Sequence, residues 1–258
     1  PEVHVQKVVI DNGRATGVEI LDKKGNRRTI RAGKEVILSA GVFGSAQLLM
    51  LSGVGPADHL KEHGIPVLAD LPVGENLHDH LFVPTTWIMP NAVHKGNASY
   101  FARGLAKELT VGGSFLENSV FETVAFLRTS QATDVPDLQL HILPWAYPSP
   151  NQDAPVRHVV DPRKAMTVMS TLIYPRSRGS VRLASNDPSA APLIDMNYLA
   201  EPGDQQVLAE GVEIIREIMK STAFGGSNKG ELHPGPEYDA ANMKAEVLNR
   251  ATTVYHGV

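Results

Sequence analysis

The sequence has 258 residues, 42% of them hydrophobic and 20% charged, which is typical of a globular chain with one large domain or two ordinary ones. Its formal net charge of -4 argues against nucleic acid as a partner, because that binding requires a basic face. The absence of cysteine excludes disulfides and thiolate metal sites, and the short apolar runs exclude a transmembrane segment. Since the first residue is Pro1, we expect a piece of a longer protein, and the sequence indicates no localisation.

Three runs rich in β-branched residues open the chain. They cover residues 3–10, 15–21 and 27–31, and turn residues separate them at 11–13 and 23–26. Alternating apolar runs joined by Asn-Gly or Gly-Asn turns favour hairpins. The first 31 residues therefore predict an antiparallel three-stranded meander.

The next stretch combines a strand-like run with a helix-like run. Residues 35–39 read as a buried strand, Ala40-Gly41 as a turn, 47–51 as part of an apolar helix, and 52–56 as a cluster of helix breakers. Small residues at such a turn let a ligand approach the backbone, and a helix N-terminus favours anions. Taken alone, these features favour an ordinary βα turn.

The exact residues of this stretch are more informative about its protein family than their hydrophobic periodicity is. From Gly41 to Gly55 it reads GVFGSAQLLMLSGVG, which resembles the second signature of the glucose-methanol-choline (GMC) family of FAD-dependent oxidoreductases. Ala46 stands where the family usually has Pro, which removes only a pre-set helix start. The resemblance implies FAD as the cofactor, a flavin cradle at Ala40 and Gly41, and contact of the adenine with the backbone of Val5.

A short helix is expected at 56–63 and a short strand at 65–68. His59 and His63 lie one helical turn apart, which would suit two ligands of a zinc site. No third ligand is evident in the local sequence, so we expect no metal and place this pair on a solvated face.

Residues 71–80, LPVGENLHDH, resemble the family's Pro-Gly-Val-Gly-x-Asn-Leu-x-Asp-His segment, with one Gly missing. The His78-Asp79-His80 triplet could be read as a metal cluster or a catalytic dyad. The resemblance instead implies a structural corner in which Asp79 and His80 satisfy backbone and neighbouring polar groups.

Beyond residue 81 the sequence predicts loops up to 116, with one helical piece at 100–109, and then a strand at 119–128. Glu122 lies among the apolar residues of that strand, and a buried carboxylate normally has a partner or a ligand. In choline-oxidising members of the family the matching Glu faces the substrate's quaternary ammonium group. A surface-facing strand position fits Glu122 equally well.

The strand expected at 136–144 resembles the family's Pro-Asp-Leu-Gln-Phe-His-Phe. Alternation puts Leu138, Leu140 and Ile142 on one face and His141 on the other. The resemblance implies that His141 lines the substrate pocket and hydrogen-bonds the substrate oxygen.

The C-terminal third carries a second, independent resemblance. After a strand at 165–174, the segments 176–183 and 192–199 are similar to the family's Pro-x-Ser-Arg-Gly-x-Val and Pro-x-Ile-Asp-x-Asn-Tyr wording. Apolar residues at helical spacing then predict helices at 203–221 and 239–250.

The chain ends TTVYHGV. Here His256 matches the catalytic His of the family, and Val254 matches a residue that packs beside the flavin. Gly257 departs from the family's Pro, and the companion Asn or His of the following helix is absent. The assignment of His256 therefore rests on its position in the motif.

The expected fold class is α/β (α+β). The resemblance implies that residues 1–80 form the C-terminal part of an FAD-binding domain. It implies that residues 81–258 form a substrate-binding domain, with a mostly antiparallel sheet, flanking helices and the GMC C-terminal segment from about 165. The chain contains no Gly-x-Gly-x-x-Gly motif, so we expect it to bind FAD weakly or not at all by itself.

The implied reaction oxidises a primary alcohol, choline-like or other, to an aldehyde. A neutral imidazole, with a reference pKa of about 6.5, can accept the hydroxyl proton, and the flavin accepts the hydride. In this hypothesis His256 is the base, His141 holds the substrate oxygen and Glu122 shapes or charges the pocket. The substrate and the electron acceptor, oxygen or a quinone, stay open.

Two other functions stay open as well. One is a hydroxynitrile-lyase-like flavoprotein that does no redox chemistry, and the other is an inactive truncated fragment. A hydrolase is disfavoured because the sequence has no Gly-x-Ser-x-Gly elbow.

Overall fold

The chain folds into two compact units, each described here by itself. The computed structural model describes residues 3–91, 98–117, 119, 121, 123–147, 163–224 and 226–258. Unit 1 comprises Pro1–Asp79, Ser177–Tyr198 and Gly257–Val258, and unit 2 comprises His80–Arg176 and Leu199–His256. Residues 177–198, which the sequence analysis assigns to the second domain, thus pack with the first unit; the domain assignment itself stays a prediction.

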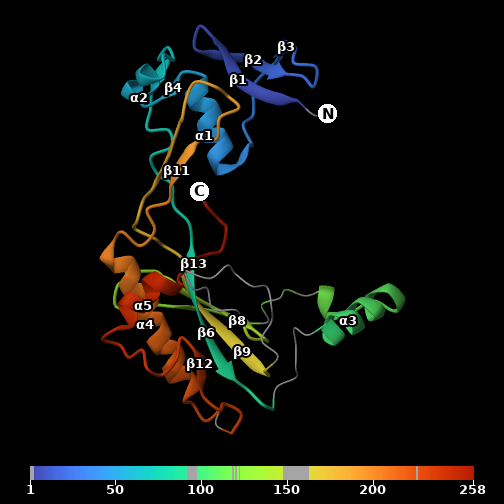
Figure 1. Ribbon diagram of the computed structural model, residues 1–258, viewed down its shortest axis with the longest axis vertical. Helices are drawn as coiled ribbons and strands as arrows, with labels where there is room; N and C mark the ends of the chain where they lie inside the picture. Colours follow the sequence, from blue (N-terminus) through green and yellow to red (C-terminus); the bar gives the residue numbers. More distant parts are fainter. Residues whose placement is uncertain are drawn as a thin grey trace. The chain divides into compact units, whose positions relative to one another are not determined.

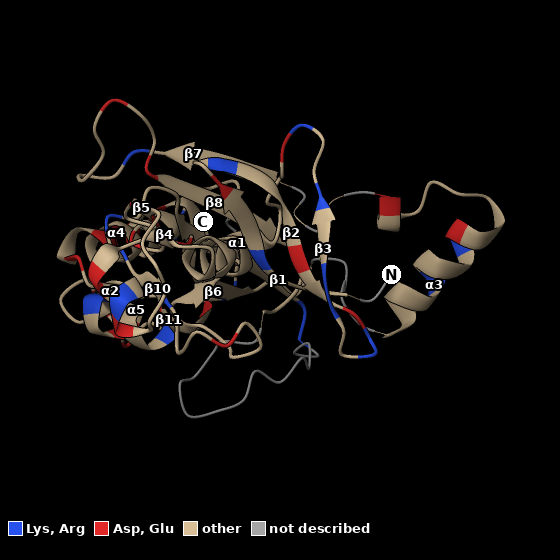
Figure 2. Cartoon of the chain, turned by 90° about the horizontal axis from the view of Figure 1, so that it is seen from above, with Lys and Arg blue, Asp and Glu red and all other residues tan. Residues whose placement is uncertain are grey.

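Unit 1 begins with the expected meander. Strands β1 (His4–Asp11), β2 (Arg14–Leu21) and β3 (Arg27–Arg31) pair in order and antiparallel (Figure 1). Asn12 and Gly13 both have positive φ, 51° and 76°, as a tight two-residue hairpin turn requires. Charged residues occur along this meander, as Figure 2 shows in blue and red for β2 and β3. The prediction of a three-stranded meander is confirmed.

The buried strand predicted at 35–39 is wrong. No strand lies between β3 and α1 (Gly41–Leu51) in the described chain, and the Ile37 side chain is 76% exposed. A run of apolar residues becomes a buried strand only where neighbouring strands cover both of its faces. The described residues supply no such neighbours for this segment.

The rest of unit 1 packs around α1. Strands β4 (Val54–Gly55) and β5 (Ala69–Asp70) form a short parallel pair on either side of α2 (Ala57–Glu62). The strand predicted at 65–68 therefore lies elsewhere, because pairing with β4 begins only at Ala69. A small apolar core joins this region to the hairpin-like pair β10 (Ser180–Arg182) and β11 (Leu193–Asp195). Its buried members are Met50, Leu60, Leu77, Val181 and Leu183.

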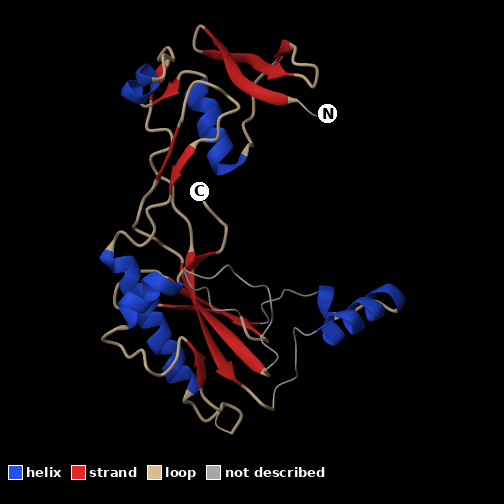
Figure 3. Cartoon of the chain, viewed as in Figure 1, coloured by secondary structure: helices blue, strands red, loops and turns tan. Residues whose placement is uncertain are grey.

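Unit 2 is built on one antiparallel sheet with order β12-β6-β9-β8-β7, and β13 also pairs with β6 (Figure 3). The strands are β6 (Leu81–Ile88), β7 (Thr123–Leu127), β8 (Leu138–Leu143), β9 (Ala165–Leu172), β12 (Glu231–His233) and β13 (Thr252–Thr253). The expected antiparallel sheet with flanking helices is confirmed. None of the described helices is both long and apolar enough to cross a bilayer.

Helices α4 (Pro202–Met219) and α5 (Met243–Arg250) cover one face of this sheet. Their apolar stripes, with Leu208, Val212 and Val247 fully buried, form the main core with the sheet. The opposite face carries a second, mostly aromatic cluster, described below. A further helix, α3 (Ala98–Thr110), precedes the short 3-10 helix Phe115–Glu117 and contacts it through Tyr100 and Phe101.

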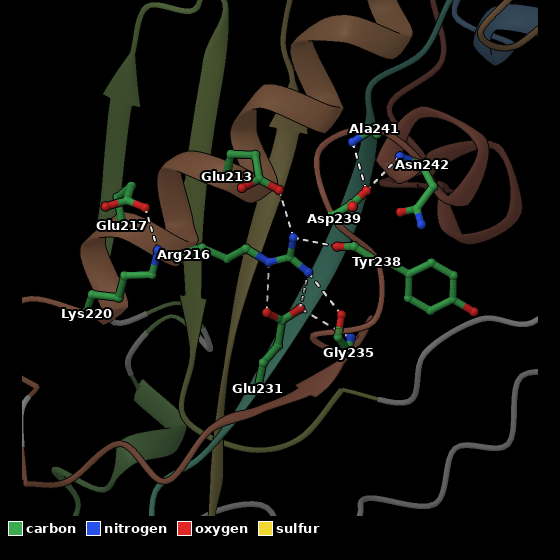
Figure 4. A network of polar contacts seen from close by, with 10 residues as sticks. All are labelled: Glu213, Arg216, Glu217, Lys220, Glu231, Gly235, Tyr238, Asp239, Ala241 and Asn242. Carbon is green, nitrogen blue, oxygen red and sulfur yellow. Dashed lines mark hydrogen bonds and ion pairs between the residues drawn. The ribbon is translucent and has the colours of Figure 1, made fainter.

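A largely buried arginine side chain connects α4 to β12 and to the loop that follows it (Figure 4). Arg216 forms two hydrogen bonds to the carboxylate of Glu231, at 2.8 and 3.0 Å, and one to Glu213 at 2.7 Å. It also donates to the carbonyl oxygens of Gly235 and Tyr238. Every side of the guanidinium thus has an acceptor, which offsets its burial.

Candidate active site

Alternation along β8 positions the first candidate residue. Leu138 and Leu140 are 0% and 4% exposed and pack into the core under the helices. His141 therefore points to the opposite face of the sheet, since successive strand residues alternate. The predicted division of this strand into two faces is confirmed.

An apolar cluster surrounds His141 on that face. The ring of Phe121 lies 4.8 Å from the imidazole, measured between centroids. The cluster has the buried residues Phe82, Leu143 and Met169 and the half-buried residues Phe121, Trp145, Tyr147 and Val254. An apolar, aromatic-lined face with one or two polar groups is the usual composition of a small-molecule site.

The C-terminal segment brings His256 to the same side. Strand β13 pairs with the start of β6, and the Val254 amide donates to the carbonyl of His80 at 3.2 Å. Val254 then packs into the aromatic cluster, and the rings of His80 and His256 lie 6.2 Å apart. The intervening Tyr255 has a φ of 61°, a left-handed conformation that is costly for a bulky residue.

The two histidines interact electrostatically. Burial lowers the pKa of His141, and the nearby charge of His256 lowers it further. His141 is therefore neutral near neutral pH. Its Nδ1 is buried and has no hydrogen-bond partner in the described part of the chain.

Tyr147 titrates abnormally for a related reason. Burial raises the pKa of the Tyr147 phenol, and interaction with Tyr255 raises it further. The phenol thus stays protonated at neutral pH and can donate a hydrogen bond on the aromatic face.

Three of the four predicted site residues of unit 2 lie in described parts of the chain. Val254 packs into the cluster on the His141 face of the sheet, and His256 lowers the pKa of His141. Glu122 lies outside the described residues. Phe82, Phe121, Trp145 and Tyr147 belong to the site region but are absent from the sequence-based set. Phe82 lies in β6, a strand where the sequence analysis expected loops, and the sequence of β6 shows no alternation that would have indicated its faces.

The predicted cofactor residues lie in unit 1. Val5 is half-buried in β1, where the pairing with β2 is irregular between Val5 and Lys7. Ala40 is the N-cap residue of α1 and has no side-chain oxygen to accept hydrogen bonds from the first-turn amides. Gly41 has a φ of 77°, and a Cβ placed there would meet nothing within 4 Å.

These features fit a flavin nucleotide. An open backbone at a positive φ allows close approach of a ring or phosphate, and the uncapped helix end favours its negative charge. The backbone at Gly41 is thus open to an approaching ligand, although the chain contributes no Gly-x-Gly-x-x-Gly turn.

The histidine pair of α2 contradicts one expectation. The His59 side chain is only 14% exposed, and its Nε2 accepts a hydrogen bond from the Leu183 amide at 2.9 Å. Burial lowers the pKa of His59, with His63 contributing. The expectation of a solvated face is therefore wrong for His59, which fastens α2 to β10. No cluster of three metal-ligating side chains occurs among the described residues.

The His78-Asp79-His80 corner has contacts of the structural kind. Asp79 is 5% exposed and accepts a hydrogen bond from the Tyr198 hydroxyl at 3.0 Å. The backbones of His78 and Val258 exchange two hydrogen bonds of 2.9 Å. The residue beside His256 is His80, which sequence reasoning treated as purely structural.

Comparison with known proteins identifies the class. The GMC oxidoreductase family matches residues 1–82 with its N-terminal part and residues 175–258 with its C-terminal part, which together make up more than half of the chain. The chain belongs to the GMC oxidoreductase family.

Named relatives are alcohol-oxidising proteins. The chain is 39% identical over 236 residues to an oxygen-dependent choline dehydrogenase of Rhizobium etli, covering 89% of this chain and 41% of the relative. It is 36% identical over 265 residues to an alcohol dehydrogenase (acceptor) of Pseudomonas putida, covering 100% of this chain and 47% of the relative. The chain thus spans less than half the length of these relatives.

Solved structures agree on the fold. Formate oxidase of Aspergillus oryzae, studied for the modification of its FAD, matches with a TM-score of 0.84 and 26% identity over 100% of this chain and 50% of its own. A fungal aryl-alcohol oxidase matches with a TM-score of 0.76 and 23% identity over 99% of this chain and 50% of its own, which supports the fold alone. The expected cofactor, FAD, is confirmed at the level of the family.

Proposed function

We propose that this chain is part of an FAD-dependent oxidoreductase that converts a primary alcohol, choline-like or other, to the aldehyde. The proposal is supported by the aromatic cluster on the His141 face of the sheet, which Val254 joins, and by the effect of His256, two residues further on, on the pKa of His141. Two imidazoles at an apolar site supply a proton acceptor and a hydrogen-bonding group for one hydroxyl.

His256 is the proposed base. Oxidation of an alcohol removes the hydroxyl proton and a hydride from the carbon that bears the hydroxyl. The imidazole of His256 accepts the proton, since histidine is the side chain that most often acts as a general base. FAD, when bound, supplies the hydride acceptor.

His141 is the proposed orienting group. Because its pKa is lowered, the ring stays neutral and offers one N–H to the substrate oxygen. A hydrogen bond in an apolar surrounding is stronger than in water, so a single donor fixes the oxygen effectively. His141 thereby orients the hydroxyl proton toward His256.

The lining of the face suits a bulky apolar or cationic alcohol. Phe82 and Tyr147 lie edge to face with centroids 5.7 Å apart, and Val254 packs beside them. Aromatic faces bind quaternary ammonium groups by cation–π attraction. We assign Glu122, from the family resemblance, to the charged end of such a substrate.

For the cofactor we assign Val5, Ala40 and Gly41. The backbone of Val5 would contact the adenine, and the open backbone at Ala40 and Gly41 would lie against the flavin nucleotide. Support comes from the positive φ of Gly41, the free space at its Cα and the uncapped start of α1.

Anaerobic mixing with alcohols tests the function. The protein should carry this chain together with the remaining length of its relatives, loaded with FAD. Loss of the oxidised-flavin absorbance on adding choline or benzyl alcohol is expected. Unchanged absorbance with a broad panel of alcohols would contradict the proposal, and cyanide release from a hydroxynitrile under the same conditions would identify the lyase alternative.

A further inference from the structure

Two buried polar atoms lack a hydrogen-bond partner in the described part of the chain. One is Nδ1 of His141 and the other is Oγ1 of Thr171. Thr171 is 2% exposed, so its hydroxyl is removed from bulk water. Because a buried donor or acceptor that is left unpaired costs its full desolvation, two such atoms in one region call for a shared explanation.

The strand register makes these two residues neighbours. His141 in β8 pairs with Met169 in β9, and Gln139 pairs with Thr171. His141 and Thr171 are therefore diagonal cross-strand neighbours on the same face, about 7 to 8 Å apart between Cα atoms. An imidazole reaches most of that distance, which leaves room for one water between Nδ1 and the hydroxyl.

The other buried hydroxyls of this face are satisfied. Thr86 Oγ1 lies 3.0 Å from Thr167 Oγ1, and Thr167 Oγ1 also lies 2.9 Å from the carbonyl oxygen of Trp145. Thr171 thus differs from these two neighbours, because its hydroxyl has no hydrogen-bond partner among the residues that the structure describes. The side chain of Gln139, directly opposite Thr171, supplies the third polar group that a buried water needs.

We propose that Thr171 is a positioning residue for His141. Through one buried water, its hydroxyl donates toward Nδ1 and keeps that nitrogen as an acceptor, so the proton of the neutral ring stays on Nε2. The Nε2–H group is then the donor to the substrate oxygen. This last step rests on the proposed function, whereas the link between Thr171 and the tautomer of His141 does not.

Nitrogen-15 NMR of the histidine side chains tests the link. Two-bond nitrogen–proton correlations distinguish the two neutral tautomers, and a His141→Gln variant assigns the signal. At pH 7.5 the chain should show His141 as one Nε2–H tautomer. Thr171→Val should give a mixture of both tautomers, while Thr171→Ser, which keeps the hydroxyl, should restore the single form.

Thr86→Val is the matched control, because it removes a buried hydroxyl from the same face without touching this pair. It should leave the His141 signal unchanged. A Thr171→Val spectrum identical to the unaltered chain, or an Nδ1–H tautomer in the unaltered chain, would overturn the proposal. If Thr171→Val does not fold, the same comparison is made between Thr171→Ser, which keeps the hydroxyl, and Thr171→Ala, which lacks it.

The measurement needs neither FAD nor an alcohol. If the His141 tautomer is unchanged in Thr171→Val, the role of Thr171 is refuted, and the proposed alcohol oxidation is unaffected. Conversely, if no alcohol reduces the flavin, the proposed function fails, but the tautomer of His141 measured by NMR is unaffected.

Discussion

His256 lowers the pKa of His141. Burial is the larger cause of the lowered pKa, and the effect of His256 adds to it. The two residues are far apart in sequence, since His141 lies in β8 and His256 near the end of the chain. Protonation of His141 beside a second imidazole and away from water is costly, so His141 is neutral near neutral pH.

The first prediction concerns stability against pH. The folded pKa of His141 is below its unfolded value of about 6.5. Below about pH 6.5 the unfolded chain therefore binds a proton that the folded chain does not, and the free energy of unfolding falls as pH falls to the folded pKa. Above pH 6.5 the contribution is fully present.

Urea unfolding at pH 7.5, 6.5 and 5.5 measures this dependence. His141→Gln should show a shallower loss between pH 6.5 and 5.5 than the unaltered chain. Some dependence should remain, because the pKa of His59 is lowered as well. Equal slopes for the two proteins would show that the environment of His141 is wrongly described.

The second prediction compares two glycines with the same backbone. Gly41 and Gly13 have φ of 77° and 76°, and a Cβ at either one would meet no atom within 4 Å. Replacing either by Ala should cost about 1–2 kcal/mol, because only the left-handed strain changes. Only Gly41→Ala should also weaken FAD binding, measured by flavin titration of the apoprotein that carries this chain together with the remaining length of its relatives. Equal FAD affinity for both variants would remove Gly41 from the cofactor site.

Secondary structure was largely predictable where an element pairs with neighbours in sequence or has a strong hydrophobic pattern. The meander, α4 and the two faces of β8 follow from β-branched runs, turn residues and helical periodicity, because their partners are local or strongly patterned. The run at 35–39 has the same apolar character, yet Ile37 is exposed, since burial depends on neighbours that periodicity does not reveal.

The candidate site was predictable only in part. A family motif pointed to His141 and His256 one at a time, but no local pattern shows that β13 pairs with β6 and so brings them together. Thr171 was missed because a threonine in an apolar strand is ordinary in sequence. Only the three-dimensional structure shows that its hydroxyl has no partner within the described ranges of the chain.

The third prediction concerns the ion pair between α4 and β12. The side chains of Arg216 and Glu231 are 11% and 6% exposed. Arg216→Met should destabilise the chain by about 3–5 kcal/mol, because it leaves the Glu231 carboxylate buried without its counter-ion. The double variant Arg216→Met with Glu231→Leu should recover much of that loss in a double-mutant cycle of urea unfolding. Additive losses would mean that the pair is not coupled.

The fourth prediction uses an apolar cavity between the sheet and α4. It has a volume of about 170 Å³, and Ala125, Ile142 and Ile215 contribute to its lining. Ala125→Leu should fill part of it and stabilise the chain by about 0.5–2 kcal/mol. Ala146→Leu, at a 1% exposed position outside this cavity, should instead destabilise by about 1–3 kcal/mol. Thermal melting distinguishes the two, and destabilisation by Ala125→Leu would show that the space is not accessible to a side chain.

The rate of flavin reduction in a His256→Asn variant tests the central claim most directly. In the FAD-loaded protein that carries this chain, stopped-flow mixing with a reactive alcohol should give a rate about 10²–10⁴-fold below that of the unaltered protein, since a general base contributes that much. Flavin reduction at the unaltered rate would contradict the assignment of His256 as the group that takes the hydroxyl proton.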